Sequence, residues 1–203
     1  MGLVIRLAEL LLILVPLVGV GYATVRAIAG ARGTPPERDS SQRTAISRAV
    51  GEHDRTDTRW LDYEIDVAKI LDFPLMTDMR EPLTQRFHRA KLRADLLRPS
   101  DVADLVDDRE SAHDYLEAVQ EYVTAFDIAE AEAVRRGRAK FSAVDQERLG
   151  RAQRLLGVAS DSGATRHERD RAYQLARREL DGLLVLPERA RAALERGISG
   201  ELG

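Results

Sequence analysis

The chain has 203 residues, of which 32% are charged and 5% aromatic, and it contains no cysteine. This length allows one ordinary domain beside a membrane segment, because most domains have roughly 100 to 150 residues. The lack of cysteine excludes disulfide bonds and thiolate metal sites. Basic and acidic residues are nearly balanced, 31 against 34, which argues against a nucleic-acid-binding protein, since such a protein needs a strongly basic face.

An apolar run near the N-terminus has the length of a membrane span. Leu10 to Val25 reads LLLILVPLVGVGYATV without a charge, and inclusion of residues 7–9 extends it to about the 19 residues that a bilayer needs. We therefore expect a transmembrane anchor at residues 1–29, with about 7–25 in the bilayer. Membrane lipid is the first partner that the sequence predicts.

The alternative to an anchor is a cleaved signal peptide. Ala27 to Ala29 reads AIA, the small-x-small pattern that signal peptidase recognises. Against cleavage, Arg6 is the only basic side chain before the run, and Arg26 follows it directly where a signal peptide is usually uncharged. An uncleaved anchor fits these charges better.

Arginine is distributed unevenly about the run, and this asymmetry predicts the topology. Arg6 alone precedes it, whereas Arg26, Arg32, Arg38 and Arg43 follow it within a short distance. Because basic residues tend to stay in the cytoplasm, we expect a single-pass protein of the cell membrane with a cytoplasmic domain. The opposite topology stays open, because the N-terminal tail is short.

Two regions follow the predicted anchor. Residues 30–41 read GARGTPPERDSS and residues 42–59 are polar with weak periodicity, so we expect a flexible linker over 30–59. The alternative for 42–59 is a helix on the membrane surface, with its arginines near anionic headgroups. From Trp60 onward apolar residues recur at helical spacing, and we expect a helical soluble domain over 60–203.

The domain is predicted to be all-α. Helices are expected at about 60–73, 82–97, 109–137, 142–159, 165–183 and 187–197, with Ser100 capping a turn at 101–105, Ser142 capping the fourth helix, and Thr165 with Glu168 forming a capping box. The expected inward residues are Leu83, Phe87, Leu92 and Leu96 in the second helix, and Ala112, Leu116, Val119, Val123 and Phe126 in the third. Short loops imply an antiparallel bundle of about three main helices, onto which residues 60–105 fold. A coiled-coil oligomer is the rival arrangement, and the oligomeric state is left open.

Two groups of polar residues are candidate sites. Glu110, His113 and Glu117 share one face of the long helix, as in half of a di-iron motif, but the sequence has no second copy. Acidic residues cluster between Asp62 and Glu81 without the spacing of a calcium loop. We interpret both groups as solvated or helix-flanking charges, and we predict no metal, no cofactor and no catalytic residue, because motifs for nucleophilic catalysis or phosphate binding are missing.

The segment WLDYEIDVAKILDFPLMTDMREPLTQRFHRA, residues 60–90, is rich in aromatic residues, methionine and proline for this chain. It resembles a stretch of uncharacterised membrane-associated proteins of high-GC Actinobacteria, in which a hydrophobic N-terminus precedes a helical body. The resemblance implies an actinobacterial envelope setting and supplies no activity. The possible partner surface in this region consists of Trp60, Tyr63, Phe73, Met76, Met79 and Phe87, although packing of the same residues over the bundle is the preferred interpretation.

The sequence therefore predicts a membrane-anchored helical interaction or scaffold protein of the bacterial cell envelope, with an unknown protein partner and no enzymatic activity. The alternatives are an accessory subunit of an envelope enzyme, with a site built from dispersed residues, or a secreted helical protein released by signal cleavage.

Overall fold

The computed structural model describes residues 35–200, and their side chains from residue 39 onward. The described part is helical and contains no strand. The predicted anchor at 1–29 lies outside the described residues, and within them no helix has the length and apolarity of a membrane span. The residues from Arg43 onward form one compact unit, and the fold described below is that of this unit.

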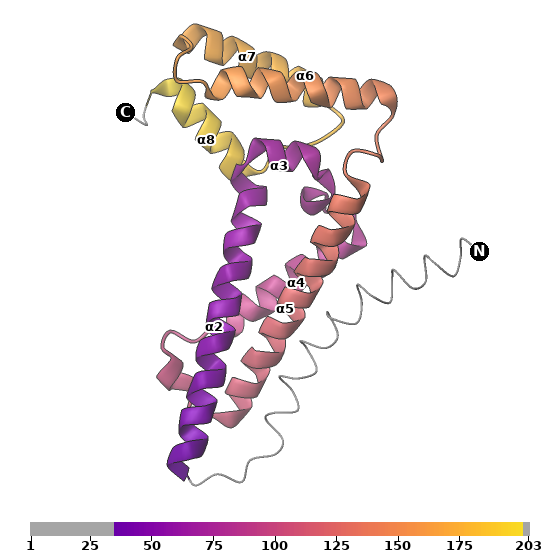
Figure 1. The fold of residues 1–203 in the computed structure, drawn as a ribbon. Helices are drawn as coiled ribbons and strands as arrows, with labels where there is room; N and C mark the ends of the chain where they lie inside the picture. The colour runs from indigo at the N-terminus through magenta and orange to yellow at the C-terminus, as the bar shows by residue number, and fades with distance from the viewer. Residues whose placement is uncertain (1–34, 201–203) are drawn as a thin grey trace, which may run out of the picture. The chain divides into compact units, whose positions relative to one another are not determined.

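Three long helices enclose the first of two apolar cores. They are α2 (Pro35–Ile65), α4 (Pro82–Leu97) and α5 (Arg109–Arg136), and Figure 1 shows α4 beside α5. The backbones of α4 and α5 approach closely, because buried alanines such as Ala90, Ala94 and Ala118 leave room for them. Larger side chains fill the space toward α2, where the Trp60 ring contacts Phe87 edge-on at 4.8 Å between centroids.

The second core lies among three helices nearer the C-terminus and one short helix. These elements are α6 (Ala143–Ser160), α7 (Arg166–Leu180), α8 (Glu188–Ser199) and α3 (Val67–Asp72). α6 and α7 form an antiparallel hairpin (Figure 1). Its interior contains Leu149, Leu156 and Ala176, and α3 adds Ile70 and Leu71.

The grouping of helices differs from the expected bundle. The long helix expected at about 109–137 was predicted to pack with the next two helices, but α5 packs with α2 and α4, while α6 and α7 belong to the second core. The apolar stripe of α5 was predicted correctly in outline. A stripe shows that a helix buries one face, but it does not show which helix covers that face.

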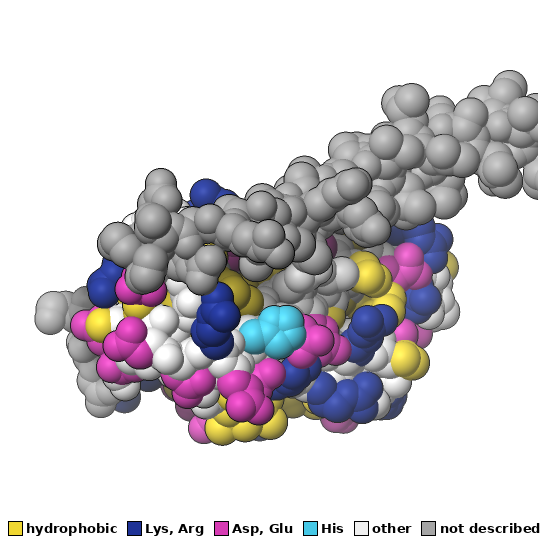
Figure 2. Space-filling model, turned by 90° about the horizontal axis from the view of Figure 1, so that it is seen from below, with side chains coloured by type: hydrophobic (Ala, Val, Ile, Leu, Met, Phe, Trp, Pro, Cys, Tyr) yellow, Lys and Arg dark blue, Asp and Glu magenta, His cyan; other side chains and the backbone are white. Residues whose placement is uncertain are grey.

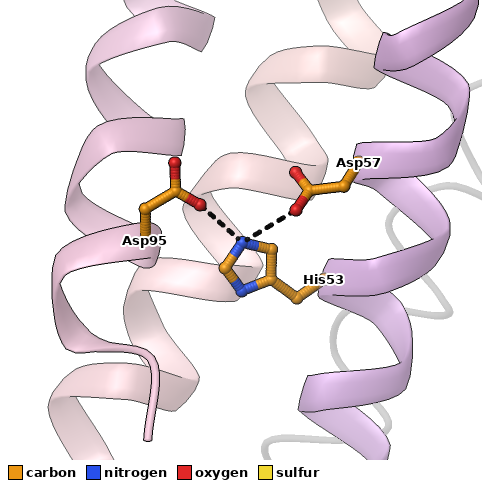
Figure 3. A group of neighbouring side chains, drawn as sticks. All are labelled: His53, Asp57 and Asp95. Carbon is orange, nitrogen blue, oxygen red and sulfur yellow. Dashed lines mark hydrogen bonds and ion pairs between the residues drawn. The ribbon is translucent and has the colours of Figure 1, made fainter. Parts of the chain in front are cut away.

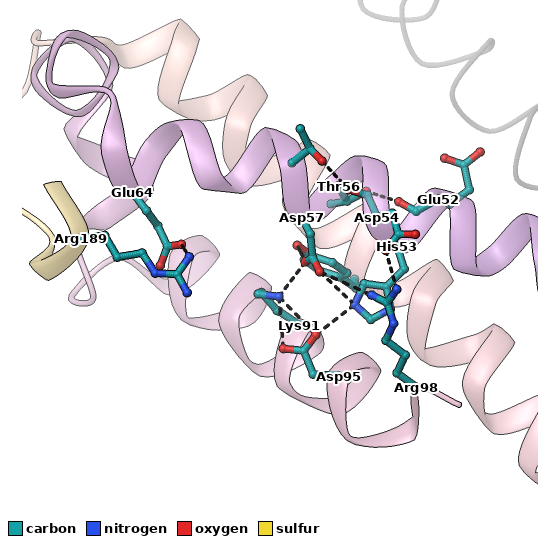
Figure 4. A network of polar contacts seen from close by, with 12 residues as sticks. Glu52, His53, Asp54, Thr56, Asp57, Glu64, Lys91, Asp95, Arg98 and Arg189 are labelled. Carbon is teal, nitrogen blue, oxygen red and sulfur yellow. Dashed lines mark hydrogen bonds and ion pairs between the residues drawn. The ribbon is translucent and has the colours of Figure 1, made fainter. Parts of the chain in front are cut away.

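Polar contacts join the two cores. Arg138, just after α5, donates to the Leu71 carbonyl at 3.0 Å and to the Asp72 carboxylate at 2.7 Å. Arg189 of α8 donates to Glu64 of α2 at 2.9 Å (Figure 4).

The helix ends follow local capping chemistry. Ser142 accepts from the Asp145 amide, and Thr165 forms the predicted capping box with Glu168, so both predicted caps are confirmed. The prediction for Ser100 was wrong by one residue, because Asp101 caps the 3₁₀ turn η2 (Val102–Leu105) and Asp104 returns a second bond. A second 3₁₀ turn, η1 (Pro74–Thr77), begins at the proline that ends α3.

The expected flexible linker over 30–59 was wrong for its described part, because α2 covers residues 35–65 as one helix. Ile46, Ala49, His53 and Thr56 are buried on the face of α2 that meets the first core. Two of these four residues are polar, and this hid the helical period from a pattern based on apolar residues alone.

The inward face of α4 was also predicted only in part. Phe87 is buried, but Leu92 and Leu96 are 59% and 77% exposed. α4 turns its small residues toward α5 so that the two backbones can approach, and this rotation places both leucines on the outside.

Candidate functional site

A buried histidine on α2 is the centre of the largest polar cluster among the described helices. His53 has no exposed surface and lies one helical turn before Asp57. Its Nε2 is 3.0 Å from the Asp95 carboxylate on α4 and 3.7 Å from that of Asp57, as Figure 3 shows. Its Nδ1 is 3.3 Å from the Tyr115 hydroxyl on α5. With the proton on Nε2, the ring donates to Asp95 and accepts from Tyr115, so the two partners favour this tautomer.

Lys91 lies between the two carboxylates of this cluster. Its ammonium donates to Asp57 at 2.6 Å and to Asp95 at 3.2 Å (Figure 4). Tyr122 of α5 donates its hydroxyl to the same oxygen of Asp57 at 2.9 Å. Asp57 is therefore bound from both α4 and α5, and the polar groups of all three helices meet at one point.

A second ion pair borders the cluster at the end of α4. Arg98, the C-cap residue of α4, donates to Asp54 of α2 and lies 3.9 Å from Asp57. The carboxylates of Asp54, Asp57 and Asp95 thus face two cations and one imidazole. We call these residues, with Tyr115 and Tyr122, the His53 network.

The two tyrosines of the network are held as neutral donors. Burial raises the pKa of Tyr115 to about 12. Burial, and after it the negative charge of Asp57, raises the pKa of Tyr122 still further. Ionisation would bury a charge at either tyrosine and, at Tyr122, would place it beside the Asp57 carboxylate, so both hydroxyls remain protonated over the physiological range.

The His53 network has the donor set of a metal site, but a cation of the protein already contacts its carboxylates. One ligand atom each from His53, Asp57 and Asp95 lies within 4.8 Å of the others, a spacing that suits a single divalent cation. The Lys91 ammonium contacts both carboxylates, so a cation would have to displace it or bind against its charge. Since His53 is fully covered, a substrate would reach the ring only after the side chains that cover it had moved.

The structure buries most of the possible partner surface. Trp60, Tyr63, Met76 and Phe87 are at most 7% exposed and lie in the first core, so the hypothesis of a partner surface was wrong for these four residues. Phe73 packs partly against the same core, and Met79 alone is well exposed, at 54%. The preferred interpretation, packing over the bundle, describes this region, because each ring finds another aromatic ring within the core.

The other polar groups singled out by sequence are surface features. Glu110, His113 and Glu117 are exposed, and Glu117 pairs with Arg93 of α4. The acidic string between Asp62 and Glu81 does not converge on one point. Its members instead form separate ion pairs, such as those of Asp62 with Lys69 and Asp72 with Arg138.

Sequence reasoning missed His53, because it lies in the segment expected to be a linker. A signal was present, since residues 46, 49, 53, 56, 60 and 63 recur at alternating steps of three and four. That spacing is typical of the buried face of a helix. His53 and Thr56 occupy two of the six positions, so the period becomes visible only if buried polar residues are admitted.

On the face drawn in Figure 2, acidic and basic side chains lie interspersed and do not form a patch of one charge. Many of them are paired across helices, as Arg93 is with Glu117 and Arg151 with Glu179.

Comparison of the chain with models of protein families, with curated proteins and with solved structures found no match in any of the three.

Proposed function

We propose that this chain is a single-pass membrane protein of a bacterial envelope whose helical unit binds a protein partner close to the cytoplasmic membrane surface. The bacterial setting rests on the resemblance of residues 60–90 to actinobacterial membrane-associated proteins. The anchor rests on the apolar run Leu10–Val25. The binding role rests on a folded helical unit whose main polar cluster is centred on a fully buried imidazole, with carboxylates that are already paired with cations of the same unit.

One observation carries the proposal furthest: the short chain length between the apolar run and the first helix of the fold. The run ends at Val25 and α2 begins at Pro35, which leaves residues 26–34 between them. Even fully extended, these nine residues span no more than about 30 Å. A helix that enters the fold so soon after an anchor keeps the unit within reach of membrane-bound partners and away from the bulk cytoplasm.

The His53 network supports the same role by joining α2 to the rest of the unit. α2 contributes His53, Asp54 and Asp57 to the network, and α4 and α5 contribute the partners. Farther along α2, Arg59 pairs with Asp127 at 2.9 Å and Tyr63 donates to Glu130 at 3.0 Å. Polar contacts therefore join α2 to α5 between residues 53 and 63, so the helix that would follow the anchor is an integral part of the first core.

Membrane fractionation tests the anchor. The full chain should sediment with membranes and resist extraction with alkaline carbonate. The double variant Ile13→Arg/Leu14→Arg places two charges in the centre of the run and should release the chain, because each charge costs a few kcal/mol there. Leu92→Arg is the matched control, since Leu92 is exposed on α4 and the variant should stay with the membrane. Release of the unaltered chain by carbonate would contradict the anchor.

Crosslinking in intact cells tests the partner. A photoreactive residue placed at Leu96, which is 77% exposed, or at Val134, which is 57% exposed, samples two outward faces of the first core. At least one such position should give an adduct of a single mass in the membrane fraction, and the adduct should disappear in the released double variant. A set of outward positions that yields no discrete adduct would contradict a binding role while leaving the anchor intact.

A further inference from the structure

A cavity of about 630 Å³ lies outside the His53 network, beside the second core. It is bounded by η1 and the turn after it, by the loop before α6, and by the connection between α7 and α8. Pockets for small molecules have roughly 300 to 1,000 Å³. The cavity is therefore large enough for a ligand of ten or more non-hydrogen atoms.

The walls of the cavity are largely apolar. Pro74, Leu180 and Leu186 are buried side chains that line it. Met79 and Val185 line it as well but are 54% and 84% exposed. Apolar surface left open beside a cavity is the feature that an apolar ligand body covers.

The charged residues around the cavity are unequal in sign. The cavity is lined by four basic residues, Arg80, Lys140, Arg177 and Arg191. The acidic residues that line it are two, Asp78 and Asp181. Asp78 is fully engaged: Arg80 donates to it at 2.9 and 3.1 Å and Lys140 donates at 2.8 Å. These contacts, with the hydrogen bond from Arg80 as the largest cause, hold the pKa of Asp78 well below its usual range.

The two remaining cations have their donors available. Within residues 39–200, neither the Arg177 nor the Arg191 guanidinium makes a hydrogen bond or ion pair. Arg177 lies over the ring of Tyr173, 5.9 Å from its centroid, and the charges of Arg177 and Arg191 both act on the Tyr173 hydroxyl. That hydroxyl already donates to Glu195 at 2.9 Å, so it does not occupy either guanidinium. A guanidinium presents parallel N–H donors that match a carboxylate or phosphate.

We propose that this cavity binds a small amphipathic anion, a carboxylate or phosphate monoester joined to an apolar body. The anionic group lies between Arg177 and Arg191, and the apolar body lies against Leu180, Leu186 and Val185. This site goes beyond the proposed function and does not depend on it, since all its lining residues belong to the folded unit.

The test uses the full chain in nanodiscs of neutral phosphatidylcholine, with 4-phenylbutyrate as the probe and binding followed by NMR. Its neutral amide, 4-phenylbutyramide, has the same apolar body and should bind at least about tenfold more weakly, because charge-assisted hydrogen bonds are lost. Phenyl phosphate should compete with 4-phenylbutyrate for the same site. Equal affinity for the acid and the amide would overturn the proposal.

Matched variants locate the site. Arg177→Gln/Arg191→Gln should weaken binding of 4-phenylbutyrate at least about tenfold, while Arg178→Gln/Arg196→Gln, on the same two helices but outside the cavity, should leave it unchanged. At the exposed Val185, substitution by Asp should weaken binding and substitution by Lys should strengthen it. All variants remove or change exposed side chains, so their melting temperatures should match that of the unaltered chain. Equal loss in both double variants would overturn the proposal.

A further arm distinguishes a free ligand from a lipid headgroup. Affinity for 4-phenylbutyrate should be the same when phosphatidylglycerol replaces part of the neutral lipid. If the probe no longer binds in discs that contain phosphatidylglycerol, the cavity is occupied by bilayer lipid, and the assignment of a free amphipathic anion is overturned.

Discussion

His53 occupies a core position that an apolar residue would fill at lower cost, since a buried polar group loses its hydration. The cost is offset because both ring nitrogens have partners, Asp95 on one side and Tyr115 on the other. These partners come from two other helices, so the bonds form in only one register of α2 against α4 and α5. A purely apolar seam would specify that register less strictly.

Removal of the imidazole should therefore be costly. His53→Ala leaves a void, an unpaired Tyr115 hydroxyl and a carboxylate with one partner fewer, and we expect a loss of about 2 to 4 kcal/mol in the free energy of unfolding. His113→Ala, at an exposed position of α5, should change it by less than about 0.5 kcal/mol. Denaturant unfolding of the full chain measures both. Equal midpoints for the two variants would contradict the role assigned to His53.

The buried tyrosines make a prediction at high pH. Tyr63, Tyr115, Tyr122 and Tyr173 all have a pKa raised above the ordinary value of 10, with burial as the largest cause. A group of this kind contributes its full stability below the unfolded pKa, and the contribution is lost as pH rises from there through the folded pKa. Stability should thus decline above about pH 10, and Tyr122→Phe should reduce the steepness of that decline.

The ultraviolet absorbance of tyrosinate checks this directly, because it reports ionisation of the phenols. The four described tyrosines should ionise together with unfolding and not before it. Titration of all of them with a midpoint near the ordinary pKa, while the chain is still folded, would contradict their burial.

At the scale of helices, sequence patterns located most boundaries and misjudged one segment. The helix at 82–97 and the start of the helix at 109 were predicted where they occur, and in the structure Pro82 is the first residue of α4 and Asp108 caps α5. α2 was missed because its buried face includes His53 and Thr56, and because Ser and Arg dominate its exposed face. The candidate site was missed with it, since three of its residues lie in that segment.

α2 is an integral part of the first core, and a single substitution tests this. Ile46 is fully buried, so Ile46→Ala should lower the free energy of unfolding by about 2 to 5 kcal/mol. Ser47→Ala, at the next and exposed position, should have almost no effect. If Ile46→Ala melted with the parent, residues 43–59 would be a linker after all.

Phe126 offers a comparison within α5. It lies in the centre of the first core with no exposed surface, whereas Ile128 is 41% exposed. Phe126→Ala should cost about 3 to 5 kcal/mol, and Ile128→Ala much less. Thermal melts of the two variants measure the difference. Similar melting temperatures would contradict an orientation of α5 that buries Phe126 and exposes Ile128.

At the scale of the whole molecule, the sequence predicted the all-helical class but not the division into two cores. Which helix meets which depends on the matching of small against large side chains, as where the alanines of α4 face α5 and Trp60 reaches across from α2. This matching of side-chain sizes between helices depends on the folded arrangement and produces no periodic pattern in the sequence. The His53 network depends on it entirely, since its members come from residues 53 to 122.

The arginines on either side of the apolar run predict the topology. A reporter that is active only in the cytoplasm should function at the C-terminus, and intact cells should shield the helical unit from added protease. Replacement of Arg26 and Arg32, with arginines added before Leu7, should weaken or reverse this orientation. An unchanged orientation would show that another feature determines it.

The central claim is that the apolar run remains attached to the helical unit as its membrane anchor. The most direct measurement is the N-terminal sequence and intact mass of the native protein isolated from the membrane fraction. We expect a chain that begins at Met1, or at Gly2 after removal of the initiator methionine. A mature chain that begins near Gly30 would contradict the claim, because it would show that signal peptidase cleaves after Ala29 and releases the helical unit from its anchor.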